Sequence, residues 1–188
     1  MKIAITGHTS GIGKSLLDKF QHRQCQVVGF SRSTGHDITN DAIQQHIVDQ
    51  LDNIDIFVNN AHAGLAQTEL FTKIWHRWRM LPKRIVNIGS ISTTFRQGPN
   101  DLPWQPLGRA HYAAEKAALE MAVNWAWNDH ASQCEAVLVK PGFVDTPRTN
   151  SGGSTFNMID ADDLAQYIVN AVLDQPFVVR ELTIRARK

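Results

Sequence analysis

The stretch KIAITGHTSGIGKSLLDKF, residues 2–20, decides the fold. It begins with a short run rich in β-branched and small apolar residues, which is typical of a buried strand. It ends with Ile12, Leu16, Leu17 and Phe20 at the spacing of one helix face. A strand that enters a helix through a glycine-rich turn predicts a chain of alternating strands and helices.

The remainder of the sequence continues this alternation. We expect further strands at residues 25–31, 54–60, 84–90, 135–141 and 177–185, and helices at residues 41–51, 68–81, 110–130 and 160–174. Asn40 or Asp41 is placed to cap the helix that ends near residue 51. This pattern predicts the α/β class, with a doubly wound parallel sheet and helices on both faces. Because no long linker or internal repeat interrupts it, we expect one domain over residues 1–188.

The bulk composition argues against several other classes. A hydrophobic fraction of 43% and a charged fraction of 20% are typical of a globular domain. The formal net charge of +1 gives no electrostatic reason to expect a nucleic-acid or membrane partner. We expect no signal peptide or membrane span, and the histidines show no metal-site spacing. Cys25 and Cys134 lie far apart, which favours reduced thiols in a cytoplasmic protein.

The glycine turn predicts a phosphate-binding site. Ligands of doubly wound sheets bind beyond the carboxyl ends of the strands, which is where this turn lies. Gly7 allows the sharp turn, Gly11 lets a pyrophosphate approach the backbone, and Gly13 lets the helix pack closely. The helix N-terminus supplies free N–H groups for the phosphates. The alternative is a purely structural glycine-rich turn.

Five motifs in order make the chain resemble the short-chain dehydrogenase/reductase family. They are T-G-x-x-x-G-x-G from Thr6, N-N-A from Asn59, N-I-G-S ending at Ser90, Y-x-x-x-K from Tyr112, and the P-G-x-x-x-T segment from Pro141. The resemblance covers nearly the whole chain and implies a Rossmann fold. It also implies an NAD(P)-dependent oxidoreductase whose substrate is a small molecule with a carbonyl or secondary alcohol.

The resemblance also implies the residues that bind the cofactor. Besides the three glycines, Tyr112 and Lys116, these are Thr9, Ser10, Ile12, Ser31, Arg32, Asp37, Ile38, Asn60, Ala61, Pro141, Gly142, Val144 and Thr146. The second strand ends in GFSRS without a carboxylate that could bind a ribose 2′-hydroxyl. The Arg32 guanidinium suits a 2′-phosphate, so we expect NADP(H) to be preferred, with NAD(H) possible. The alternative is an exposed arginine with no ligand.

Tyr112 and Lys116 share one helix face because they are four residues apart. An ordinary tyrosine pKa of about 10 is too high for efficient proton exchange near neutrality, and a neighbouring ammonium favours the phenolate. We expect Tyr112 to be the general acid/base, Lys116 to tune it and bind the nicotinamide ribose, and Ser90 to hold the substrate oxygen. The alternative is a solvated surface pair.

The chain departs from the family in several places. The family has a catalytic asparagine on the helix after N-N-A, but no asparagine lies between Asn60 and Asn87. A Pro/Gly-rich loop over residues 94–109 widens the interval between Ser90 and Tyr112. His62 takes the place of the glycine in N-N-A-G, and we expect it either to touch the cofactor or to pack. His8, in the glycine turn, has the same two alternatives.

Two functions from different classes fit these residues. The first is the oxidoreductase, which the resemblance implies to be a homo-oligomer, either a dimer or a tetramer. The second is a non-catalytic dinucleotide-binding sensor or scaffold, which the missing asparagine favours. Ser90, Tyr112 and Lys116 together favour the enzyme.

Overall fold

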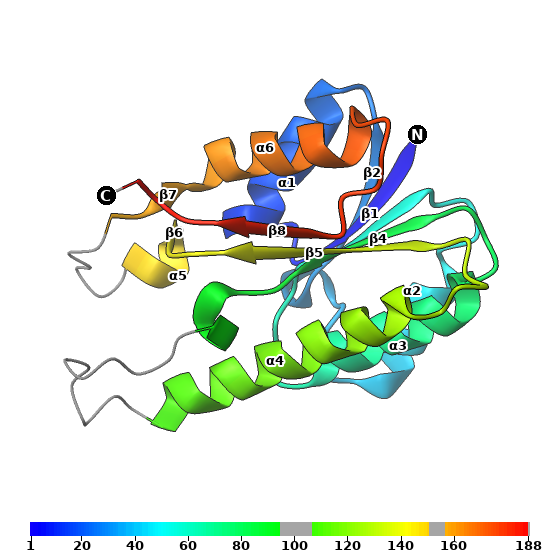
Figure 1. Ribbon diagram of the computed structural model, residues 1–188, viewed down its shortest axis with the longest axis horizontal. Helices are drawn as coiled ribbons and strands as arrows, with labels where there is room; N and C mark the ends of the chain where they lie inside the picture. The colour runs from blue at the N-terminus through cyan, green and yellow to red at the C-terminus, as the bar shows by residue number, and fades with distance from the viewer. Residues whose placement is uncertain (95–106, 151–156, 188) are drawn as a thin grey trace.

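Six parallel strands form the central sheet (Figure 1). In order across the sheet they are β2 (Gln26–Phe30), β1 (Lys2–Thr6), β3 (Ile56–Asn59), β4 (Arg84–Ile88), β5 (Glu135–Pro141) and β8 (Glu181–Ile184). The computed structural model describes residues 1–94, 107–150 and 157–187. The chain moves outward from β1 to β2 and then crosses back to β3, so the switch point lies between β1 and β3. The predicted doubly wound parallel sheet is confirmed.

Helices cover both faces of the sheet (Figure 1). One face carries α1 (Gly11–His22) and α6 (Ala161–Leu173), and the other carries α2 (Asp41–Asp49), α3 (Ala66–Trp78) and α4 (Leu107–Trp127). Shorter elements occupy the connections at the carboxyl edge. These are the 3₁₀ turns η1 (Arg32–Thr34) and η2 (Ile91–Thr94), the strand pair β6 (Val144–Asp145) and β7 (Ile159–Asp160), and the single-turn helix α5 (Pro147–Asn150).

The core divides into two layers because successive strand residues point to opposite faces. In β3, Phe57 is fully buried against the α2–α3–α4 side, while Ile56 and Val58 pack on the α1–α6 side. All four residues of this strand are buried, as expected for a strand covered on both faces. Trp78 completes the α3 side with no exposed surface.

Several of the predicted element boundaries need correction, mostly by one or two residues, and β3, for example, begins at Ile56 rather than at residue 54. α3 begins at Ala66, two residues earlier than expected, and α4 runs from Leu107 to Trp127 rather than over residues 110–130. The last strand covers only Glu181–Ile184. Phe177 and Val178 precede it and are 62% and 46% exposed, so their apolar character does not reflect pairing in the sheet. The helix cap is confirmed, because the Asn40 side chain accepts from two backbone N–H groups of α2.

Two further expectations from the sequence concern a loop and membrane-spanning helices. Most of the loop predicted over residues 94–109 lies outside the described residues. In the described part of the chain, helices lack the combination of length and apolar character that crossing a membrane demands.

Candidate functional site

The glycine turn after β1 has the geometry of a backbone cradle. Gly7 and Gly11 adopt positive φ angles of 71° and 52°, which side chains of L-residues rarely adopt. A Cβ at Gly13 would lie 2.2 Å from the carbonyl oxygen of Gly7. Only glycine therefore lets α1 start so close to β1. The exposed Thr9 and Ser10 and the half-buried Ile12 complete the turn.

Thr6 and Asn60 join this turn to the loop after β3. The Thr6 hydroxyl accepts from the backbone N–H groups of Asn60 at 2.9 Å and Ala61 at 3.0 Å. In return, the Asn60 side-chain amide donates to the carbonyl oxygen of Thr6 at 2.9 Å. These bonds hold the two loops together across the switch point, where a doubly wound sheet binds its ligand.

The end of β2 carries hydroxyl groups beside one exposed guanidinium. Ser31 is buried, and its hydroxyl lies 2.8 Å from that of Ser33, which donates to Thr9 of the glycine turn at 3.1 Å. Arg32 lies between the two serines with its side chain exposed. The strands β1 and β3 separate this group from β4, so Arg32 lies toward the opposite end of the carboxyl edge from Ser90.

Asp37 and Ile38 follow in the same connection. Asp37 accepts at one oxygen from both the N–H and the hydroxyl of Thr39, and these bonds hold its pKa below the ordinary range. Ile38 is buried in the core, and its carbonyl oxygen accepts from the Gln44 side chain at 2.8 Å. Asp37 therefore presents its carboxylate from a rigid turn.

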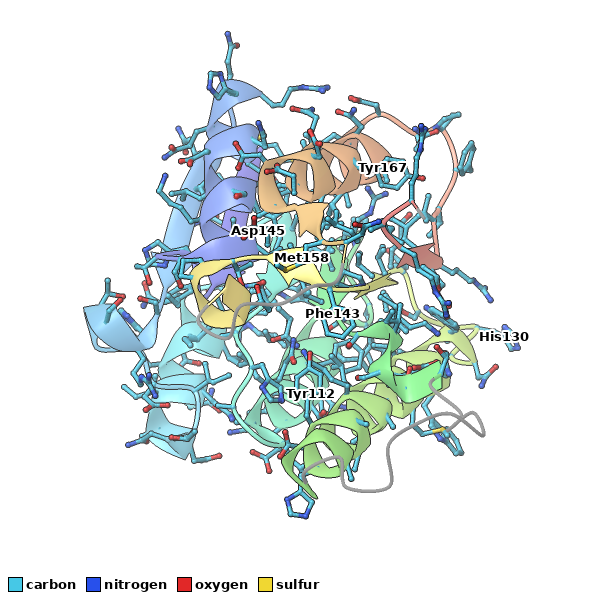
Figure 2. All side chains as sticks on the ribbon, turned by 90° about the vertical axis from the view of Figure 1, so that its left-hand side faces the viewer. Tyr112, His130, Phe143, Asp145, Met158 and Tyr167 are labelled. Carbon is cyan, nitrogen blue, oxygen red and sulfur yellow. The ribbon has the colours of Figure 1, made fainter. Side chains whose placement is uncertain are left out.

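The P-G-x-x-x-T segment closes the other side of the glycine turn. Pro141 ends β5, and the N–H of Gly142 donates to Ile184 of β8 at 2.8 Å. Val144 is buried in β6, and Thr146 lies so close to the glycine turn that a Cβ at Gly11 would be 3.3 Å from its methyl group. Figure 2 views this edge of the sheet, with Tyr112 below and Phe143, Asp145 and Met158 above it.

Tyr112 and Lys116 lie in α4, as the spacing predicts, but they differ in burial. Tyr112 is half-buried, whereas Lys116 is only 3% exposed. The Lys116 ammonium lies 5.7 Å from the centre of the Tyr112 ring. It donates to the carbonyl oxygen of Ile88 at 2.8 Å, and Ser90 follows two residues later. The pair is therefore not a solvated surface pair, because the ammonium is anchored to the end of β4.

Gln67 is a residue of this site that the sequence search for an asparagine missed. It lies in the first turn of α3, is 1% exposed, and accepts from the Lys116 ammonium at 2.8 Å. Its amide nitrogen donates to the carbonyl oxygens of Asn59 at 2.7 Å and Ile88 at 3.1 Å. The position two residues into a helix after N-N-A was its only signal in the sequence.

Two buried asparagines extend this network into the sheet. Asn59 and Asn87 are cross-strand neighbours, and the side chain of Asn59 donates to that of Asn87 at 3.0 Å. The same Asn59 amide donates to the carbonyl oxygen of Gln67 at 3.0 Å. We call Asn87, Asn59, Gln67 and Lys116 the buried polar chain.

The two histidines differ in their surroundings. His62 lies 2.9 Å from the Glu115 carboxylate, and its ring meets the Tyr112 ring edge-on with centres 4.9 Å apart. His8 packs over Gly29 of β2, where a Cβ would lie 2.3 Å from its ring. Within the described residues, the buried Nδ1 of His8 has no hydrogen-bond partner. His62 therefore borders Tyr112, while His8 packs on β2.

Comparison with known proteins shows the class to which this fold belongs. The chain superposes on a 3-alpha-hydroxysteroid dehydrogenase from Pseudomonas sp. B-0831, complexed with NADH, with a TM-score of 0.75 over 98% of this chain and 95% of that one, at 21% identity. A short-chain dehydrogenase/reductase from Vibrio parahaemolyticus gives a TM-score of 0.77 over 99% and 100%, at 17% identity. A short-chain dehydrogenase from Burkholderia cenocepacia J2315, in complex with NADP, gives 0.73 over 97% and 87%, at 18% identity. The protein has a Rossmann-type fold.

Sequence similarity adds to the structural likeness. No family model matches the chain. The 3-oxoacyl-(acyl-carrier-protein) reductase FabG of Vibrio cholerae serotype O1 is 25% identical over an alignment that covers 78% of this chain and 75% of that protein. Together, these matches show that the chain is similar in sequence and in fold to short-chain dehydrogenases and reductases.

The Thr6 hydroxyl yields a prediction about stability. Thr6→Val keeps the shape of the side chain but leaves two N–H groups of the Asn60–Ala61 loop without their acceptor. We expect the free energy of unfolding to fall by about 1–3 kcal/mol, measured by urea denaturation. Thr6→Ser, which retains the hydroxyl, should lose less. Equal losses in the two variants would show that the lost methyl packing, and not the hydrogen bonds, matters.

Proposed function

We propose that the protein is an NAD(P)-dependent oxidoreductase that transfers a hydride between nicotinamide and a carbonyl or secondary alcohol of a small molecule. The observation that carries this proposal is the buried Lys116 ammonium, which lies beside Tyr112 and is bonded to the strand that ends next to Ser90. A protein that only binds a dinucleotide has no need of a buried charge beside a phenol. The NADH and NADP complexes among the related structures support the cofactor class.

The cofactor fits the residues present. Thr146 lies against the glycine cradle at the N-terminus of α1, and backbone N–H groups at such a helix start suit the pyrophosphate that we propose to bind there. Bound nicotinamide supplies the hydride, and the protein supplies position and proton transfer. We propose that the cofactor-binding residues are those of the glycine turn, the end of β2, Asn60–Ala61 and the segment from Pro141 to Thr146.

In this proposal, three side chains divide the chemistry at the substrate oxygen. Ser90 holds the oxygen at the end of β4. Tyr112 gives a proton to it during carbonyl reduction and takes one back during alcohol oxidation. The Lys116 ammonium lies 5.7 Å from the centre of the Tyr112 ring, and because Lys116 is buried, water does little to screen this charge from the phenol.

We further propose a preference for NADP(H). The support is the end of β2, where Arg32 is exposed among the hydroxyl groups of Thr9, Ser31 and Ser33. A guanidinium and neutral hydroxyl donors suit a 2′-phosphate, and a carboxylate at this position would repel it.

We also propose that the protein associates through α3 and α4. A groove of about 600 Å³ lies between these helices, and most of its lining is apolar or aromatic, including Phe71, Trp75 and Met121. Trp125 is 72% exposed at its margin. A second copy of the same face would bury these side chains at a twofold interface.

The role of Tyr112 can be tested by a matched pair of variants. Tyr112→Phe should lower turnover of a reducible carbonyl about 10²–10⁴-fold, the usual contribution of a general acid/base, while NADPH binding is retained. Tyr167→Phe removes the same hydroxyl from a tyrosine that is 54% exposed on α6, and should leave turnover unchanged. The measurement is a screen of carbonyls with NADPH and NADH. Undiminished turnover in Tyr112→Phe would refute the oxidoreductase mechanism. If the unaltered protein binds the cofactor but turns over no carbonyl, the sensor or scaffold is favoured.

Arg32→Gln tests the cofactor preference. We expect NADPH affinity to fall about tenfold or more, because a charge-assisted hydrogen bond is lost, while NADH affinity changes little. Isothermal titration calorimetry measures both. Arg77→Gln, at the far end of α3 where Arg77 pairs with Asp52, is the control. Tighter NADH binding by the unaltered protein would contradict the preference.

Trp125→Glu tests the interface. A charge in the apolar groove should convert an oligomer to a monomer, measured by sedimentation velocity. Trp127→Phe, on the same helix but half-buried against β5, is the control. Identical masses for the unaltered protein and Trp125→Glu would exclude this face as the interface.

A further inference from the structure

Gln67 has an amide whose orientation is fixed by its partners. Its nitrogen faces two backbone carbonyl oxygens, those of Asn59 and Ile88. The reverse orientation would place the amide oxygen against the same two acceptors, where it could make no hydrogen bond. The side-chain oxygen must therefore face away from the strands, and there it accepts from the Lys116 ammonium at 2.8 Å.

The ammonium that Gln67 meets has lost nearly all of its water. At 3% exposure, Lys116 needs protein acceptors to stay charged, since a buried charge without partners is strongly disfavoured. Gln67 and the carbonyl oxygen of Ile88 each accept from it at 2.8 Å. The two contacts hold the ammonium between the first turn of α3 and the end of β4, and they constrain its distance from the Tyr112 ring.

We propose that Gln67 is the positioning residue for Lys116. It holds the ammonium in place and charged, and through that charge it favours the phenolate of Tyr112. The inference rests on the proposed function only for the catalytic role of Tyr112.

The other charged groups that contact Tyr112 or pair with residues of α4 are compatible with this assignment. His62 lies against the phenol ring and is paired with Glu115. Lys140 of β5 is bound between Glu120 of α4 and Glu181 of β8. Despite its burial, its pKa is raised by its hydrogen bonds to these two glutamates. None of these groups changes in the variants described below, so their influence is common to every comparison.

Titration of the phenol provides the test, because the chain has only two tyrosines. In a Tyr167→Phe background, the labelled ring carbon of Tyr112 gives a single NMR signal that reports its ionisation. Gln67→Met removes the acceptor while keeping an unbranched side chain of similar length. We expect the titration midpoint to rise by about one pH unit, because a displaced or neutralised ammonium no longer favours the phenolate. Gln67→Asn, which keeps an amide on a shorter side chain, should recover part of the difference.

A double-mutant cycle separates positioning from packing. If Gln67 acts through the Lys116 charge, Gln67→Met should produce no further shift in a Lys116→Met background. Gln44→Met, which removes another buried glutamine that bonds Ile38 and Ala66, should leave the Tyr112 midpoint unchanged. The proposal is overturned if the Gln67→Met midpoint matches that of the parent, or if the shift persists without Lys116.

The outcome is separable from that of the proposed function. If turnover depends on Tyr112 but the titration midpoint of Tyr112 is the same in Gln67→Met as in the parent, only the positioning role is overturned. A midpoint that depends on both Gln67 and Lys116, in a protein that reduces no carbonyl, supports the positioning role and removes the enzymatic one.

Discussion

Lys116 is only 3% exposed, so its ammonium depends on protein acceptors to replace the water that it loses. The desolvation of such a group costs several kcal/mol, and hydrogen bonds of good geometry must offset it. Two such acceptors come from other elements, the first turn of α3 and the end of β4. The position of α4 against the sheet therefore follows from one charge as well as from apolar packing.

The switch point is held by a different kind of constraint. At Gly13, a Cβ would overlap the backbone of Gly7, so the start of α1 is set by sterics. The loop after β3 is set by hydrogen bonds, which Thr6 and Asn60 exchange across the strands. One side of the candidate site therefore depends on the absence of side chains, and the other on their polar groups. The steric constraint at Gly13 and the hydrogen bonds of Thr6 and Asn60 meet between β1 and β3, where the crossover leaves an open crevice in folds of this kind.

The sequence was sufficient for the sheet and the glycine turn, and it narrowed the helix cap to Asn40 or Asp41, because each depends on local pattern or on a residue with one conformational use. It was insufficient for the last strand, where Phe177 and Val178 are apolar yet largely exposed. It also missed Gln67, since a search for one residue type on α3 overlooks a longer amide that reaches the same ammonium. Contacts between side chains more than forty residues apart, such as Gln67 with Lys116, carry no periodic signal. They had to be seen in three dimensions.

The buried polar chain also limits how this protein can diverge. Asn87, Asn59, Gln67 and Lys116 come from two strands and two helices, and none is more than 3% exposed. Replacing any one of them by an apolar residue leaves a donor or an acceptor of its neighbour without a partner and away from water. This costs about 1–3 kcal/mol of folding free energy. Replacing the whole set together removes the penalty between the four side chains, and what remains is the loss of donors to backbone carbonyl oxygens such as that of Ile88. Among descendants of this sequence, we expect the four positions to be retained together or exchanged together, as if they were a single inherited character.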